Sequence, residues 1–181
     1  MKQENNGVWT SWNENLTYKY KSLYKITTEK ELQEVVAKTD KIRFFGTKQS
    51  SADIAAGIDT LIDITSYNKI VSYNETEQTV TVQSGVILGD LLEAIEAKGW
   101  CIPCLPDINT ITIGGALATG THGTSGHLLC EYMTACTLVL ADGSLKKVNE
   151  SDTFMLAARV SLGAMGVMST VTFTCEPIYT L

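Results

Sequence analysis

The sequence has little of what marks several other protein classes. Only 3 prolines and 14 glycines occur among its 181 residues, which excludes collagen-like and proline-rich chains. No apolar run approaches the roughly 20 residues of a membrane-spanning helix. The first residues, MKQENNGVWTSW, lack the apolar core of a signal peptide. The formal charge is −6 and no basic tract is present, so the chain is a poor candidate for binding nucleic acid.

The cysteines do not form the framework of a small disulfide-rich domain. Five are present, an odd number, and they are spread along the chain. This pattern is typical of a reducing compartment, so we expect a cytoplasmic protein. Hydrophobic residues make up 44% of the chain, enough to bury a core in one domain of this length.

Helices and strands are expected to alternate irregularly, which favours an α+β fold with mixed parallel and antiparallel sheets. Apolar residues at helical spacing and capping residues predict helices at residues 28–39, 88–98 and 151–158. Short apolar or alternating runs predict strands at residues 41–46, 61–64, 70–73, 78–84, 134–140, 144–148 and 167–175. Residues 47–59 are expected to form a polar loop. The first 26 residues are expected to be an irregular arm, which Trp9 and Trp12 could pin to the body.

A first candidate site follows the strand expected at 41–46. The residues are Gly46, Thr47, Lys48, Gln49, Ser50 and Ser51. Such a turn of glycine and small polar residues can leave several backbone N–H groups free to bind anionic oxygens. An ordinary surface turn is the alternative, because glycine and serine are common after strands.

A second candidate site lies in LPDINTITIGGALATGTHGT, residues 105–124. Thr112 can cap a short helix, and Gly114 and Gly115 allow another body to approach the backbone. The free N–H groups at the start of such a helix would suit a phosphate or pyrophosphate and need no basic residue. A glycine-rich helix that merely packs closely is the alternative.

A third segment, SLGAMGV at residues 161–167, places two glycines just before a strand. Gly163 and Gly166 indicate a tight turn where another part of the molecule packs on bare backbone. Taken alone, this segment predicts a turn and nothing more.

Together the three segments resemble a known family. The chain resembles the FAD-binding domain of the vanillyl-alcohol oxidase superfamily. The motifs that carry the resemblance are Arg43-x-x-Gly46-Thr47-x-x-Ser50, ATGTHGT at 118–124, LVLADGSLKKV at 138–148 and SLGAMGV at 161–167. The similarity is greatest to the branch of aldonolactone and alditol oxidases. It extends from about Trp9 to Leu181.

The resemblance implies a two-lobed domain over residues 9–181, with lobes at roughly 9–74 and 75–181 and FAD held between them. It implies a flavin-dependent oxidoreductase, acting as an oxidase on the CH–OH groups of sugar lactones or alditols. Loop 46–51 would wrap the pyrophosphate, and Pro106 would lie near the reactive edge of the flavin. The cofactor-binding residues implied are Gly46, Thr47, Lys48, Gln49, Ser50, Ser51, Pro106, Asp107, Thr112, Gly114, Gly115, Thr119, Gly120, Thr121, His122, Gly166 and Val167.

Two departures from the family pattern change these expectations. Many members carry a histidine, covalently bound to the flavin, where this chain has Gln49. An amide has no comparable nucleophilic nitrogen, so FAD is expected to be held non-covalently. Members also continue into a cap domain that supplies most substrate-binding and acid–base groups. That domain is expected to be absent from this chain, which ends at Leu181, and a separate cap or substrate domain is a possible partner.

Two other functions remain open from the residues alone. One is a FAD-binding protein without catalysis of its own, acting as a carrier, sensor or partner subunit. The other is a zinc or redox-thiol module, because Cys101 and Cys104, with His122 and His127, have spacing near that of metal ligands.

Overall fold

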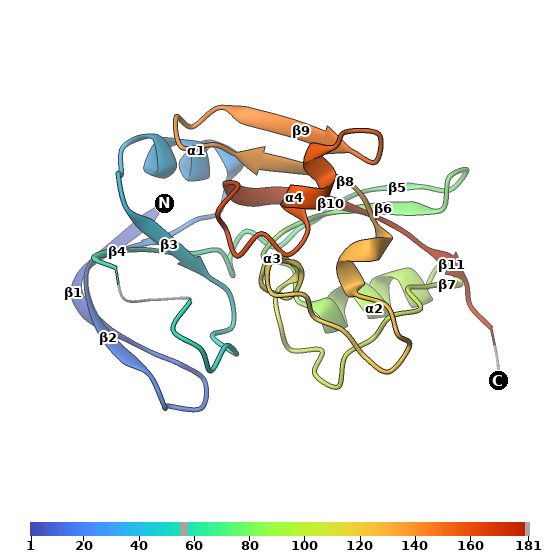
Figure 1. Ribbon diagram of the computed structural model, residues 1–181, viewed down its shortest axis with the longest axis horizontal. Helices are drawn as coiled ribbons and strands as arrows, with labels where there is room; N and C mark the ends of the chain where they lie inside the picture. Colours follow the sequence, from blue (N-terminus) through green and yellow to red (C-terminus); the bar gives the residue numbers. More distant parts are fainter. Residues whose placement is uncertain (55–57, 180–181) are drawn as a thin grey trace.

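The N-terminal part of the chain forms a four-stranded sheet. The computed structural model describes residues 1–54 and 58–179 (Figure 1). The strand order is β1-β2-β4-β3, with β1 antiparallel to β2 and parallel pairing between β2 and β4 and between β3 and β4. The strands are β1 Lys2–Thr10, β2 Thr17–Lys25, β3 Ile42–Phe45 and β4 Thr60–Asp63.

The second sheet has five strands in the order β5-β6-β10-β8-β9, and every neighbouring pair is antiparallel. The strands are β5 Ile70–Asn74, β6 Thr79–Gln83, β8 Met133–Val139, β9 Leu145–Asn149 and β10 Val167–Thr174. A short pair, β7 Trp100–Cys101 and β11 Glu176–Pro177, extends from it toward the C-terminus (Figure 1).

Local sequence explains where the main helices begin and end. In α1, Glu29–Ala37, the side chain of Thr28 accepts from the N–H of Glu31, whose carboxylate accepts from the Thr28 N–H; this is a capping box. In α2, Leu88–Glu96, the chain leaves the helix at Gly99, whose φ of +75° is left-handed. The remaining helices are α3 Ile113–Ala118, the 3₁₀ turn η1 Leu129–Tyr132 and α4 Phe154–Ala158.

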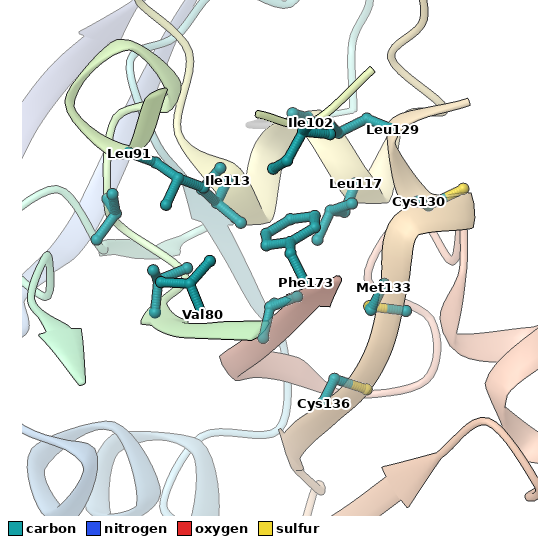
Figure 2. Close-up of a cluster of buried hydrophobic side chains, with 14 of the residues drawn as sticks. Val80, Leu91, Ile102, Ile113, Leu117, Leu129, Cys130, Met133, Cys136 and Phe173 are labelled. Carbon is teal, nitrogen blue, oxygen red and sulfur yellow. The ribbon is translucent and has the colours of Figure 1, made fainter. Parts of the chain in front are cut away.

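The largest core lies between the five-stranded sheet and the helices α2 and α3, which cover one of its faces (Figure 1). Phe173 of β10 is fully buried there, beside Ile113 and Leu117 of α3 (Figure 2). A second cluster joins the two sheets, because α1 packs against Ile62 of β4 and Val139 of β8. The pocket described below is therefore built on two sheets that share a buried core.

The predicted fold class and most predicted elements are confirmed. The structure is α+β with mixed sheets, and each predicted helix and strand overlaps an observed one. Strands up to β4 belong to one sheet, and the later strands belong to the five-stranded sheet or to the short β7–β11 pair, whereas the division into lobes near residue 74 stays a prediction. Part of the predicted loop 47–59, residues 55–57, lies outside the described residues. No helix in the described part is long and apolar enough to cross a membrane.

The prediction of an irregular N-terminal arm is wrong. These residues form the β1–β2 hairpin, which enters the four-stranded sheet through parallel pairing of β2 with β4. Trp9 does anchor the hairpin: it is 2% exposed and packs on Tyr18 and Phe45. Trp12 does not, because it lies in the turn and is 69% exposed.

Candidate functional site

A pocket of about 730 Å³ lies where the loop after β3 meets the segment leading into and out of α3. This volume is within the range of small-molecule and cofactor sites. Its lining combines apolar side chains with small polar residues and bare backbone. The lining residues are Arg43, Phe44, Phe45, Gly46, Thr47, Lys48, Gln49, Ser50, Ser51, Ala52, Ile54, Ile64, Pro106, Asp107, Ile108, Ile111, Thr112, Gly114, Gly115, Ala116, Ala118, Thr119, Thr121, His122, Gly123, Thr124 and Leu162.

Two glycines allow the walls of the pocket to come together. A Cβ on Gly46 would overlap the side chain of Thr112, so the loop after β3 and the start of α3 touch there. A Cβ on Gly123 would overlap the carbonyl oxygen of Leu105, which brings the two ends of the 105–124 segment together. The first and second predicted segments therefore form one site.

The loop after β3 has the free donors that its sequence predicted. Among the described residues, the backbone N–H groups of residues 47–51 have no hydrogen-bond acceptor. The loop is nevertheless held in place, because the N–H of Trp12 donates to the carbonyl of Lys48 at 2.9 Å. Lys48 has a φ of +62°, a conformation uncommon for a residue with a side chain. N–H groups arranged around such a left-handed residue can form an anion-binding concavity.

The prediction of free N–H groups at the start of α3 is wrong. The N–H of Ile113 donates to the Val86 carbonyl and that of Gly114 to the Ser84 carbonyl, both in the turn just after β6. The N–H of Gly115 donates to the Thr112 hydroxyl, and that of Ala116 to the Thr112 carbonyl. The first turn of α3 is therefore satisfied within the protein, so its N–H groups are not free to bind a ligand.

The two glycines of α3 have different surroundings. Gly114 is buried, and a Cβ there would lie 3.0 Å from the Ser84 Cβ, so this glycine serves packing on the sheet. Gly115 is exposed on the pocket wall, and an added Cβ would meet only the Thr112 hydroxyl, at 3.1 Å. A ligand can therefore approach the backbone of Gly115 directly.

The residues after α3 form one edge of the pocket. Thr119 donates its hydroxyl proton to the Gly115 carbonyl, and the Thr121 N–H donates to the Ala116 carbonyl. His122 is exposed, with its Nδ1 3.1 Å from the Gly123 carbonyl oxygen. Gly120 does not line the pocket; with a φ of +68° it turns the chain next to Val160.

The third segment places neither of its predicted site residues on the pocket. At Gly166 a Cβ would lie 2.6 Å from the Val139 carbonyl oxygen, so this glycine permits close packing on β8. Val167 is 2% exposed within the cluster that joins the two sheets. Leu162, from the same segment, does line the pocket and is 53% exposed.

Sequence reasoning missed other parts of the lining. Ile54, Ile108 and Ile111 give the pocket apolar surface, although they carry no recognisable motif. Arg43 also lines it, at the head of the motif that carried the family resemblance. The pocket is apolar because side chains from separate segments come together in the fold, and this cannot be read from a single sequence.

The cysteines and histidines considered for a zinc site have other partners. The thiol of Cys104 donates to the His127 carbonyl at 3.1 Å, and the ring of His127 contacts Glu131 at 2.9 Å. No group of three or more potential ligands that could hold a metal occurs in the part of the chain that the structure describes. Burial raises the pKa of the Cys101 thiol above its usual value, which disfavours the thiolate needed for redox chemistry.

Comparisons with known proteins identify the class of domain. A family model described as a FAD binding domain matches residues 21–149, and the chain belongs to this family. The solved cholesterol oxidase of Brevibacterium sterolicum shares the fold, with a TM-score of 0.87, 18% identity and coverage of 97% of this chain and 37% of that one.

Curated relatives are flavin-family oxidoreductases of the predicted branch. L-gulonolactone oxidase of Mus musculus is 33% identical over 87% of this chain and 38% of its own length. L-gulono-1,4-lactone dehydrogenase of Mycobacterium tuberculosis is 32% identical over 96% and 42%, and alditol oxidase of a Streptomyces species is 31% identical over 94% and 42%. The predicted family is confirmed, and the chain spans about two-fifths of the length of these relatives.

The pocket fits the cofactor that the family implies. FAD combines an anionic pyrophosphate with a large apolar ring system. Residues 47–51 provide unpaired N–H groups for the anion, and Gly115 exposes bare backbone. Ile108 and Ile111 provide apolar surface for the rings. The predicted cofactor, FAD, is thus confirmed by the family and agrees with the chemistry of the pocket.

Proposed function

We propose that this FAD-binding domain holds its cofactor non-covalently and serves an oxidoreductase that acts on sugar lactones or alditols. The observation that carries the cofactor-binding part is the junction of loop 46–51 with α3 at Gly46 and Thr112. This junction places unpaired N–H groups beside a glycine-lined apolar pocket. The substrate class is supported by the names of the relatives.

Specific chain residues would hold the cofactor. The N–H groups of residues 47–51 would bind the pyrophosphate, and Gly115 would allow close approach of the ligand. When bound, FAD supplies the capacity to accept two electrons from a CH–OH group, while the protein provides orientation and electrostatics. Pro106 and Asp107 would line the flavin end, as the resemblance implies. Gln49, half-buried on the pocket wall, offers only an amide, so no covalent link is proposed there.

Groups for proton transfer are proposed to come from outside these 181 residues. Within the described pocket, the carboxylate of Asp107 and the ring of His122 are both exposed. Efficient acid–base catalysis requires a group held within hydrogen-bond reach of the substrate. A cap or substrate domain, joined to this domain or separate from it, would supply such groups and cover the flavin.

A non-catalytic FAD-binding role is the second candidate, and the same exposed setting of Asp107 and His122 favours it. We place either role in the cytoplasm, because all five cysteines are free and a reducing compartment preserves them.

Flavin analysis and turnover assays test the proposal. The purified chain, loaded with FAD, is given aldonolactones and alditols with an electron acceptor, both alone and with the remaining domains of a relative. We expect FAD binding in both cases, and turnover only when the second component is present. Absence of FAD binding would contradict the proposed cofactor role. Binding without turnover in either case would favour the non-catalytic role.

A further inference from the structure

The chain contains two arginines, and their side chains have contrasting surroundings. Arg159 donates from Nη2 to the carbonyl oxygen of Met133 at 3.0 Å and to that of Glu131 at 3.5 Å. Arg43 makes no hydrogen bond or ion pair with any residue that the structure describes. The Nε of each arginine is covered and has no acceptor among the described residues, but Arg159 has carbonyl partners at Nη2, whereas Arg43 has no described partner at any of its nitrogens.

Arg43 lies where a ligand can supply the missing acceptor. It sits in β3, in register with Leu61 of β4, and it lines the pocket. Its Nε is fully covered by protein atoms yet has no acceptor among the described residues. Unpaired donors of a charged group cost free energy, and because Arg43 lines the pocket, an acceptor bound there would recover part of it through the remaining guanidinium N–H groups.

The nearby charges favour an anionic acceptor. Arg43 and Phe45 point to the same face of β3, about 6.6 Å apart along the strand. The ammonium of Lys48 lies 5.5 Å from the centre of the Phe45 ring, so two cations border this part of the pocket. The carboxylate within the described lining, that of Asp107, comes from the separate segment before α3. A guanidinium matches the paired oxygens of a phosphate better than it matches any neutral acceptor.

We propose that Arg43 binds a phosphate of the dinucleotide and is a cofactor-binding residue in addition to the backbone N–H groups of residues 47–51. The inference rests on the proposed FAD site and deepens it. Backbone donors alone were predicted to suffice for the pyrophosphate, and the position of Arg43 adds a charged side chain to them. Lys48, in contrast, contacts the rings of Trp9 and Phe45 and needs no phosphate to satisfy it.

Nitrogen-15 NMR of the arginine side chains can test this on the unaltered protein. Two Nε–H signals are expected, and Arg159→Lys assigns them by removing one. ADP is the probe, because it carries the diphosphate without the flavin. We expect ADP to move the Arg43 signal and to leave the Arg159 signal in place. ADP-induced shifts in the amides of residues 47–51 without movement of the Arg43 signal would overturn the proposal.

Affinity measurements provide a second, independent readout. Arg43→Gln is expected to weaken ADP and FAD binding by about tenfold to hundredfold, as charge-assisted hydrogen bonds do, and Arg43→Lys is expected to weaken it less. Riboflavin, which has no phosphate, should bind both variants and the parent equally. Arg159→Lys is the matched control and should retain the parent affinity for ADP. An Arg43→Gln protein that binds ADP within twofold of the parent, or that loses riboflavin and ADP equally, would refute the role of Arg43.

The outcome for the parent protein separates this proposal from the proposed function. A parent that binds neither FAD nor ADP would contradict the FAD site itself. The parent could instead bind both ligands while ADP fails to move the Arg43 signal and Arg43→Gln fails to weaken binding. That result would leave the FAD site intact and overturn only the assignment of Arg43.

Discussion

At the residue scale, the exposed backbone of Gly115 yields the sharpest prediction. Gly115→Ala is expected to weaken FAD binding while leaving the free energy of unfolding equal or higher, since alanine is favoured over glycine inside a helix by about 1 kcal/mol. Gly115→Val should weaken binding further, because its larger side chain projects into the pocket. FAD titration and thermal unfolding measure the two effects separately.

A matched control separates ligand contact from helix propensity. Ala157, on the exposed face of α4, is not part of the pocket lining. Ala157→Val should lower stability slightly, by under about 1 kcal/mol, and leave FAD affinity unchanged. If Gly115→Val binds FAD as well as Ala157→Val does, direct approach of the ligand to residue 115 is refuted.

Gln49 predicts that the flavin is not covalently attached to the protein. Its amide cannot form the bond that a histidine forms at this position in many family members. Acid precipitation of the loaded protein should therefore release all flavin into the supernatant. Gln49→His tests the position itself, with partial attachment expected after incubation with FAD. Flavin fluorescence that remains on the denatured parent protein in a gel would contradict the prediction.

The buried thiols predict a low chemical reactivity. Burial raises the pKa of Cys136 and Cys175 to about 11, above the usual value of 9, so the thiolate is scarce at pH 8. Cys104 and Cys130 are also buried, whereas Cys101 is partly exposed. N-ethylmaleimide should label at most Cys101 in the native protein and all five thiols in denaturant, as read by mass spectrometry. Rapid native labelling of Cys136 would mean that the sheet opens readily.

The same pKa shift determines whether the stability of the folded protein rises or falls with pH. A thiol whose pKa is raised on folding contributes stability below its unfolded pKa, and this contribution is lost as pH rises toward the folded value. The melting temperature should therefore fall as pH is raised from 9 to 11. Cys136→Ala should reduce the size of that fall relative to the parent.

At the element scale, the β1–β2 hairpin positions the loop that carries the free N–H groups. The backbone N–H of Trp12 donates to the Lys48 carbonyl, and the Asn15 side chain donates to the Ser51 carbonyl at 3.2 Å. Asn15→Ala is expected to weaken FAD binding by about threefold to tenfold, since one hydrogen bond contributes about 0.5–1.5 kcal/mol. FAD titration measures this directly.

Asn13 gives the matched control for that prediction. It lies in the same turn and accepts from the Ser11 hydroxyl at 3.0 Å, but among the described residues it makes no hydrogen bond with the loop. Asn13→Ala should leave FAD affinity at the parent value. Equal losses in the two variants would show that the turn as a whole, and not the Asn15–Ser51 contact, determines affinity.

Elements with regular patterns were predictable, and those formed by distant pairing were not. Residues 79–83 alternate valine with polar residues, so a half-buried strand was evident. β1, KQENNGVWT, is mostly polar because only Trp9 is buried, and it therefore carries no alternation signal. Its strand conformation comes from pairing with β2, which in turn pairs with β4 in parallel register. Such long-range pairing is absent from local sequence.

The same distinction applies to the site. Gly46 and Thr112 were each identified from local motifs, and the structure brings them into contact. The N–H groups of α3 were predicted to be free, but the carbonyls of Ser84 and Val86, just after β6 and 27 or more residues upstream, accept from two of them. Gly166 was assigned to the cofactor, yet it serves packing on β8. A glycine motif thus indicates close approach without indicating what approaches.

At the scale of the whole molecule, the two sheets share one buried cluster around α1, and the pocket lies at the meeting of segments from both parts of the chain. Ligand binding should therefore stabilise the domain as a unit. Saturating FAD is expected to raise the melting temperature, with a single transition retained, because a ligand that binds only the folded state stabilises it by mass action. Riboflavin should give a smaller rise, since it lacks the phosphates that residues 47–51 would bind.

The central claim is that the free N–H groups of residues 47–51 recognise a pyrophosphate, and a paired titration with FAD and FMN tests it most directly. FMN carries the same ring system and a single phosphate, so it would leave part of the donor set unused. The account predicts that FAD binds at least about tenfold more tightly than FMN, which corresponds to about 1.4 kcal/mol. Equal affinity for the two flavins would contradict it.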